Sequence, residues 1–156
     1  MAILAEGIKA PSFTGKDQDG KKISLADFKG KKVVLYFYPQ DNTPTCTLQA
    51  CNLRDNFSAL QKEGIVVIGV SPDEEAKHKK FETKFELPFT LLADPELDII
   101  KKYGVWGGKS MYGKSYMGLL RTTFLIDENG IIKKIFSKPK SKEHSEEILK
   151  AWKEIG

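Results

Sequence analysis

The sequence predicts an α/β protein with a central mixed β-sheet and helices on both of its faces. Two continuous runs of β-branched and aromatic residues, at 32–38 and 65–70, are typical of strands buried on both sides. Segments with helical spacing of apolar residues separate such runs, and a late hairpin signal adds antiparallel strands. A chain of 156 residues is close to the usual size of one domain, so we expect a single domain over 1–156.

The first half of the chain alternates strands with helices. Residues 21–28 alternate weakly and predict a short edge strand, and the run 32–38, which Pro39 stops, predicts a buried strand. Residues 43–63 predict one amphipathic helix, because apolar residues recur at spacings of three and four and Gly64 suits the position after its end. These apolar positions are Ala50, Leu53, Phe57 and Leu60.

The middle of the chain continues the alternation and then changes character. Residues 65–70 predict a second buried strand, 72–86 a lysine-rich surface helix, 90–93 a third strand and 95–103 a short helix. The segment 104–118 contains five glycines and predicts a long surface loop.

The end of the chain predicts a hairpin and a helix. Residues 122–127 and 131–137 flank an Asn-Gly pair, which is the strongest short hairpin signal, and 143–155 predicts the closing helix. This order of elements resembles the thioredoxin-like architecture.

Composition and charge exclude several classes of function. The 25 basic and 21 acidic residues form no dense basic face, because the lysines stand in short clusters, so we expect no nucleic-acid partner. The apolar run within residues 1–13 is too short for a signal peptide or a membrane span, which predicts a cytoplasmic protein without a membrane partner. Two cysteines are too few for a disulfide scaffold, and in a reducing compartment they are redox-active or incidental.

The stretch 39–46, between a predicted buried strand and a predicted helix, carries the chemistry. Thr43 suits the N-cap and Pro44 the first helical position, which places Cys46 in the first turn. Unpaired backbone N–H groups and the positive end of the helix dipole favour a thiolate there. The alternative is a buried cysteine that packs as a small hydrophobic residue, and the neighbouring second cysteine favours the reactive interpretation.

Cys51 follows Cys46 at a spacing of five, which is not the C-x-x-C of a dithiol oxidoreductase or a zinc site. A sulfenic acid formed on one thiol can close a disulfide with a second, and Cys51 is the candidate for that second role. His78 and His144 fall in segments rich in lysine and glutamate, so we expect both to be solvated and predict no metal site.

The same residues resemble a known family. Pro39, Thr43 and Cys46 match the P-x-x-x-T-x-x-C motif of peroxiredoxins, and Cys51 matches the resolving position of the bacterioferritin comigratory protein, or peroxiredoxin Q, subfamily. The likeness covers nearly the whole chain and includes the blocks 36–39, 69–73, 103–106, 111–114 and 121–127.

This resemblance implies a thiol-dependent peroxidase that reduces hydrogen peroxide and organic hydroperoxides in antioxidant defence. Cys46 would attack the O–O bond, Thr43 would hydrogen-bond the reacting oxygens, Arg121 would hold the thiolate and polarise the peroxide, and Pro39 would shield the pocket. Cys51 would then close an intramolecular disulfide. The resemblance further implies a monomer without a cofactor, recycled by thioredoxin, with glutaredoxin or glutathione as the alternative reductant.

Some alternatives stay open at this level. Arg121 could equally be an edge-strand arginine paired with a surface carboxylate. Gln49 stands where the subfamily commonly has glutamate, and Thr45 stands where it has glycine; both could change rate or substrate choice. The segment 106–117 borders the peroxide entrance, forms a subunit contact or is a plain surface excursion, and the last is slightly favoured.

Two rival functions share this fold class. A thioredoxin-like reductase would carry two cysteines separated by two residues, and the observed spacing argues against it. In a non-enzymatic interaction module both cysteines would be ordinary helix residues. An intramolecular disulfide formed on peroxide treatment separates that module from the peroxidase, because an inert pair leaves the mass unchanged.

Overall fold

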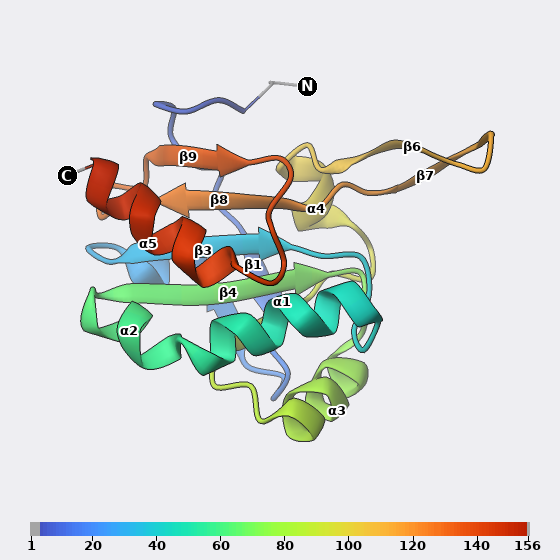
Figure 1. Ribbon diagram of the computed structural model, residues 1–156, viewed down its shortest axis with the longest axis horizontal. Helices are drawn as coiled ribbons and strands as arrows, with labels where there is room; N and C mark the ends of the chain where they lie inside the picture. Colours follow the sequence, from blue (N-terminus) through green and yellow to red (C-terminus); the bar gives the residue numbers. More distant parts are fainter. Residues whose placement is uncertain (1–3, 156) are drawn as a thin grey trace.

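The computed structural model describes residues 4–155, and its main sheet contains seven strands in the order β2-β1-β5-β4-β3-β8-β9 (Figure 1). The central strands β3, β4 and β5 run parallel, whereas the other neighbouring pairs are antiparallel, so the sheet is mixed as predicted. The strands are β1 (Thr14–Lys16), β2 (Lys22–Ser24), β3 (Lys32–Phe37), β4 (Ile65–Ser71), β5 (Thr90–Ala93), β8 (Thr122–Ile126) and β9 (Ile132–Phe136).

Helices cover both faces of this sheet, which confirms the prediction. Four helices pack on one face: α1 (Pro44–Asp55), α2 (Phe57–Lys62), α3 (Glu75–Phe85) and α5 (His144–Ile155). The other face is covered by α4 (Asp98–Lys102) and the short 3-10 helix η1 (Leu25–Phe28). The side chains of β3 alternate between the two cores, with Tyr36 under α1 and Phe37 on the α4 side. Among the described helices none is long and apolar enough to cross a membrane.

The predicted buried strands and the late hairpin are confirmed, but the edge strand predicted over 21–28 is strand only at Lys22–Ser24, because Leu25–Phe28 forms η1. The predicted helix over 43–63 is two helices. Asn56 separates α1 from α2 with φ −111° and ψ 14°. Its backbone N–H and its side-chain Nδ2 both donate to the carbonyl of Asn52, at 3.2 and 2.9 Å. Asparagine side chains compete with the backbone in this way, so the helix ends there although the apolar pattern continues.

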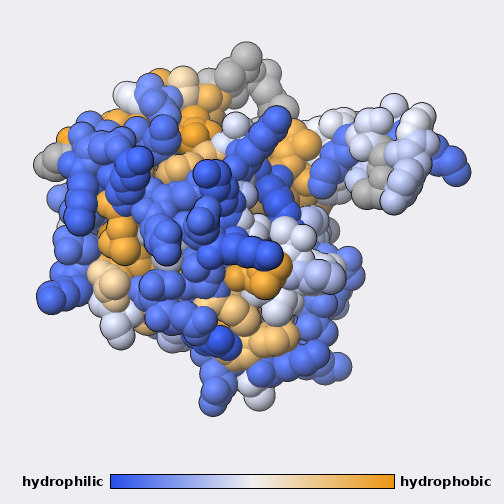
Figure 2. Space-filling view, in the orientation of Figure 1, coloured by the Kyte–Doolittle hydropathy of each residue, from blue (hydrophilic) through white to orange (hydrophobic). Residues whose placement is uncertain are grey.

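The predicted loop over 104–118 is wrong, because this segment forms a second, two-stranded sheet of β6 (Trp106–Met111) and β7 (Lys114–Leu119). Tyr112 and Gly113 connect the strands with φ values of 53° and 78°. Two successive positive φ values make the tight turn that matches strand twist, and glycine adopts them without strain. Figures 1 and 2 show this hairpin standing out from the body of the molecule. The glycines obscured the strand pattern.

Two predicted helices begin later than the sequence suggested. Residues 72–74 precede α3 and residues 95–97 precede α4. The start of α4 is determined by Asp94, whose carboxylate accepts hydrogen bonds from the backbone N–H groups of Ile99 and Ile100 at 3.2 and 2.8 Å. Burial raises the pKa of Asp94 above its usual value, although these two hydrogen bonds oppose the shift.

Candidate active site

The connection from β3 to α1 carries three of the predicted site residues to one end of the sheet. Pro39 follows the strand, and Thr43 occupies the N-cap, where its carbonyl accepts the backbone N–H of Thr47 at 2.8 Å. Cys46 therefore lies in the first turn of α1, as predicted, and it is only 1% exposed. A buried sulfur at this position faces the positive end of the helix dipole.

Thr43 does not cap the helix with its side chain, although its position is that of the N-cap. Its hydroxyl donates instead to the backbone carbonyl of Gln40 at 3.0 Å. A hydroxyl has one proton and two lone pairs, so the oxygen of Thr43 remains an acceptor for a second group. The first-turn N–H groups of α1 are likewise left without a bond from this side chain.

Arg121 lies beside Cys46, although 75 residues separate them along the chain. Arg121 immediately precedes β8, and β8 pairs with β3 so that Thr122 stands opposite Phe37. One guanidinium nitrogen, Nη2, donates to Sγ of Cys46 at 2.8 Å. Among the described residues Arg121 forms no ion pair with a carboxylate, so the surface-pair alternative is wrong.

Gln49 holds the other side of the same guanidinium. Its Oε1 accepts a hydrogen bond from Nη1 of Arg121 at 3.2 Å, and its side chain is completely buried. Because the amide is neutral, it orients the guanidinium without neutralising it. The Nε2 of Gln49 has no hydrogen-bond partner among the described residues. The departure from glutamate at this position therefore bears directly on the charge that acts on Cys46.

Cys51 lies on the same helix as Cys46 and is half-buried. The two sulfurs are not bonded to each other in this structure. Cys51 therefore shares α1 with Cys46, but the hydrogen bonds of Arg121 go to Cys46 and Gln49 and not to Cys51.

A cleft of about 500 Å³ opens beside Arg121, and the β6–β7 hairpin forms one of its walls. Its lining includes Pro39, Thr43, Trp106, Lys109, Tyr116 and Arg121. The favoured interpretation of 106–117 as a plain surface excursion is therefore corrected: this segment lines a cleft together with Arg121, which contacts Cys46. The hairpin reaches the site because β7 leads directly, through Leu120, into Arg121.

The expectation that His78 is solvated is also wrong, because its side chain is completely buried. Its Nε2 lies 2.9 Å from the carbonyl of Leu92, which can only accept, so this nitrogen carries a proton. Its Nδ1 contacts the Asp41 carboxylate at 2.5 Å, and that carboxylate also accepts from the Tyr38 hydroxyl at 2.6 Å. Asp41 belongs to the 38–43 connection, so this network holds the segment that carries Thr43.

The Asp41 network was missed because lysines surround His78 in the sequence. The one available signal was Phe81, three residues later, which marks the same buried face of α3. Asp73 joins the network, since its carboxylate accepts from the backbone N–H of Asp41 at 2.7 Å. Oxygens of Asp41 and Asp73 and a nitrogen of His78 lie within 4.8 Å of one another, and hydrogen bonds engage all three side chains.

His144 is the second buried histidine that was expected to be solvated. Burial lowers its pKa below the usual value of 6.5, and Glu147 opposes this shift. A neutral ring fits both contacts: Nδ1 donates to the Glu147 carboxylate at 3.0 Å, and Nε2 accepts from the Thr123 hydroxyl at 2.8 Å. This pair supports the start of α5 and takes no part in the cleft.

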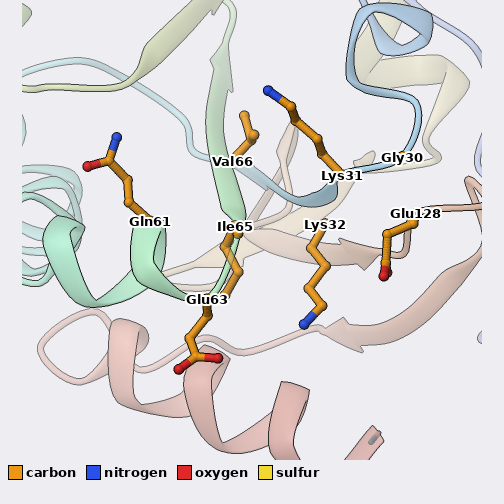
Figure 3. A pocket seen from close by; sticks show the side chains of 9 residues that line it. Gly30, Lys31, Lys32, Gln61, Glu63, Ile65, Val66 and Glu128 are labelled. Atoms are coloured by element: carbon orange, nitrogen blue, oxygen red, sulfur yellow. The ribbon is translucent and has the colours of Figure 1, made fainter.

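A second hollow, of about 470 Å³, contains none of the predicted site residues. It lies where β3 and β4 begin, whereas Cys46 lies beyond the end of β3. Figure 3 shows that the side chains of Lys31, Lys32, Glu63 and Glu128 point in different directions and do not converge. No common ligand position is formed among them.

Comparisons with known proteins point to one family. The model of the AhpC/TSA family matches residues 7–135. Peroxiredoxin Bcp of Bacillus subtilis is 46% identical, covering 96% of this chain and 95% of that protein, and peroxiredoxin Bcp of Escherichia coli is 45% identical, covering 99% of each. A structure of the Xanthomonas campestris bacterioferritin comigratory protein, which concerns its alkyl peroxide reduction activity, superimposes with a TM-score of 0.85 at 30% identity, covering 91% of this chain and 90% of that chain. The predicted thioredoxin-like fold is thereby confirmed.

Proposed function

The chain belongs to the AhpC/TSA family, within the Bcp or peroxiredoxin Q group of thiol-dependent peroxidases, and we propose that Cys46 is the sulfur that attacks the peroxide. The single observation that carries this proposal is the 2.8 Å contact between Cys46 Sγ and Arg121 Nη2. A guanidinium beside a sulfur in the first turn of a helix stabilises the thiolate, which is the nucleophilic form. Sulfur nucleophiles act only in that form at useful rates.

In the first step the Cys46 thiolate attacks the terminal oxygen of the hydroperoxide. The O–O bond breaks, that oxygen stays on the sulfur as a sulfenate, and its proton leaves with the departing alcohol or water. The sulfenate then takes a proton from solvent and becomes the sulfenic acid. Arg121 is placed to stabilise negative charge that develops on the leaving oxygen. Thr43, whose own proton is donated to Gln40, can accept the O–H of the incoming peroxide. Pro39 lines the cleft and limits access of water.

In the second step the Cys51 thiol attacks the sulfenic sulfur, and a disulfide and one water molecule form. Five residues of regular helix separate the two Cα atoms by roughly 8 to 9 Å. A disulfide requires Cα atoms within about 7 Å. Because α1 is continuous from Pro44 to Asp55, it must unwind locally before the bond can close.

The substrate range includes hydrogen peroxide and organic hydroperoxides. Support for the larger substrates comes from the hairpin wall, where Trp106 and Tyr116 offer aromatic surface beside Arg121. The Xanthomonas campestris relative, at 30% identity, is described by its alkyl peroxide reduction activity.

Family membership implies a peroxide substrate and a thiol reductant. Thioredoxin is the reductant that we favour, because unwinding of α1 exposes the disulfide to a protein surface; glutaredoxin or glutathione is the alternative. We further propose a monomer in which residues 1–156 form one catalytic domain. A cytoplasmic location suits an enzyme whose two cysteines must return to thiols, because that compartment is reducing.

The experiment is intact mass spectrometry after one equivalent of peroxide, on the wild-type protein and on two single variants. The wild type should lose two hydrogens as the disulfide forms. Cys46→Ser should neither react nor support reductant-dependent turnover, because a hydroxyl is not ionised near neutral pH. Cys51→Ser should add one oxygen at Cys46 with the first equivalent and, given a second equivalent, proceed to sulfinic acid. Turnover retained in Cys46→Ser would overturn the assignment of Cys46, and over-oxidation equal to that of the wild type in Cys51→Ser would overturn that of Cys51.

A further inference from the structure

One side chain links the helix that carries both cysteines to the start of another helix. Asn52, which directly follows Cys51 on α1, accepts the backbone N–H of Ser145 on its Oδ1 at 2.8 Å. Its Nδ2 donates to the backbone carbonyl of Lys142 at 2.9 Å. Figure 1 shows the connection from β9 coming down to α1 before α5 begins. Asn52 therefore satisfies a donor in the first turn of α5 and an acceptor just before it.

The two hydrogen bonds of Asn52 lie where they oppose formation of the disulfide. The first N–H groups of a helix have no partner within that helix, so Asn52 supplies one that α5 lacks. Disulfide formation requires the backbone between Cys46 and Cys51 to leave helical geometry, and Asn52 is the next residue. Its side chain cannot keep both partners if the backbone beside it turns, so both hydrogen bonds resist the unwinding.

We propose that Asn52 is a positioning residue that holds α1 folded and thereby sets how the Cys46 sulfenic acid is partitioned between two fates. If α1 opens, Cys51 reaches the sulfenic sulfur and the disulfide forms with loss of water. If α1 stays closed, a second hydroperoxide oxidises the sulfenic acid to sulfinic acid and leaves as its alcohol. This inference rests on the proposed roles of Cys46 and Cys51.

Arg121 also contacts α1, at Cys46 and Gln49, but those contacts belong to the reactive site itself. The remaining contacts of α1 do not offer the same control. Ala50 and Leu53 are almost completely buried and belong to the core, so they support the whole fold. Arg54 donates to the carbonyl of Phe85 at 2.8 Å, but it lies three residues beyond Cys51. Asn52 is only half-buried, so water can replace both of its partners when α1 opens.

The variant test compares Asn52→Ala with Asn56→Ala. Asn56 is the matched control, because its Nδ2 donates to the backbone carbonyl of Asn52 at the end of α1 and, among the described residues, to none in α5. A typical hydrogen bond shifts an equilibrium by about 5-fold, so losing two would raise the ratio of disulfide to sulfinic acid at fixed peroxide by about 25-fold. The higher helix propensity of alanine opposes this by about 3-fold, so we expect a net rise of roughly 10-fold in Asn52→Ala. Asn56→Ala should leave the ratio near that of the wild type. Alanine favours the helix more than asparagine does, so helix propensity alone would lower the ratio.

A second measurement needs no variant. Hydrogen exchange of the wild-type protein, reduced and as the disulfide, should show that the Ser145 amide loses protection on oxidation, because its acceptor on Asn52 has moved away. The amide of Ile148, inside α5, should keep its protection. A Ser145 amide that stays protected in the disulfide form, or an unchanged ratio in Asn52→Ala, would overturn the proposed role of Asn52 alone. A wild-type protein that forms no Cys46–Cys51 disulfide would instead overturn the proposed role of Cys51, and with it that of Asn52.

Discussion

At the scale of single residues, the site is organised by the two terminal nitrogens of the Arg121 guanidinium. Nη2 of Arg121 contacts Cys46, and Nη1 contacts the neutral amide of Gln49. A glutamate at position 49 would share the positive charge with the thiolate. The neutral amide leaves more of the positive charge of Arg121 to act on the sulfur, and it still fixes the plane of the guanidinium. This planar group is what distinguishes arginine from lysine.

Arg121→Lys tests whether that plane matters. Lysine keeps one positive charge but cannot hold the sulfur and the Gln49 oxygen at the same time, so charge on the reacting oxygens should be stabilised less well. The peroxidase rate should fall on the order of 10- to 100-fold. Stopped-flow reduction of hydrogen peroxide checks this effect. A variant with the wild-type rate would show that Arg121 serves only the structure.

At the scale of elements, α1 and the β6–β7 hairpin have contrasting tasks. The first holds both cysteines and, in the proposed mechanism, must unwind locally, whereas the second forms a wall of the cleft. The break at Asn56 gives the unwinding a natural limit, because α2 begins as a separate helix at Phe57.

Oxidation should therefore expose the amides of α1 and spare its neighbours. Hydrogen exchange after one equivalent of peroxide should show loss of protection over residues 47–55, because the disulfide and a regular helix are incompatible. The strand β3 and the helix α2 should keep their protection. Undiminished protection across α1, with the disulfide confirmed by mass, would contradict the placement of both thiols in one rigid helix.

The hairpin should contribute to the binding of bulky substrates. Tyr116→Ala removes an aromatic ring from the cleft wall and should raise KM for an aromatic hydroperoxide by about 5-fold, with little change for hydrogen peroxide. Tyr112→Ala is the matched control, because Tyr112 is 97% exposed at the turn of the hairpin and does not line the cleft. Steady-state kinetics with both substrates checks this, and equal effects of the two variants would argue against a substrate wall.

At the scale of the whole molecule, the sheet brings the site together and two buried histidines support it from the side. His78 holds the connection that carries Thr43, and His144 holds the start of α5 near the partners of Asn52. The ring of His144 lies inside the fold, and burial lowers its pKa, so the free energy of unfolding responds to the proton that this ring excludes.

The pH dependence of stability follows from His144. Its pKa is lowered in the folded state by burial, so the unfolded chain binds a proton more readily. The stabilisation is fully present above the unfolded value of 6.5 and is lost as pH falls toward the lowered folded value. The loss approaches about 1.4 kcal/mol per pH unit for one proton. Urea unfolding between neutral and mildly acidic pH should show a smaller loss of unfolding free energy for His144→Gln than for the wild type. Parallel plots of unfolding free energy against pH for the two proteins would contradict this.

The sequence by itself determined the features that depend on local backbone chemistry. The β-branched run of β3 is a strand wherever it packs, and Thr43 and Pro44 start a helix that puts Cys46 in its first turn. The peroxiredoxin motif lies within these few residues, so the placement of Cys46 was predictable together with the mixed sheet.

Only the tertiary structure decided which distant side chains meet. Arg121 reaches Cys46 because β8 pairs with β3, and no spacing in the chain encodes that pairing. The lysines around His78 predicted a solvated helix, but one buried face in contact with Asp41 outweighs its exposed neighbours. The hairpin formed despite its glycines, since a tight turn at Tyr112 and Gly113 brings two strands into register. These outcomes arise from long-range packing and hydrogen bonding, whose free energies exceed the weak local preferences from which the sequence is interpreted.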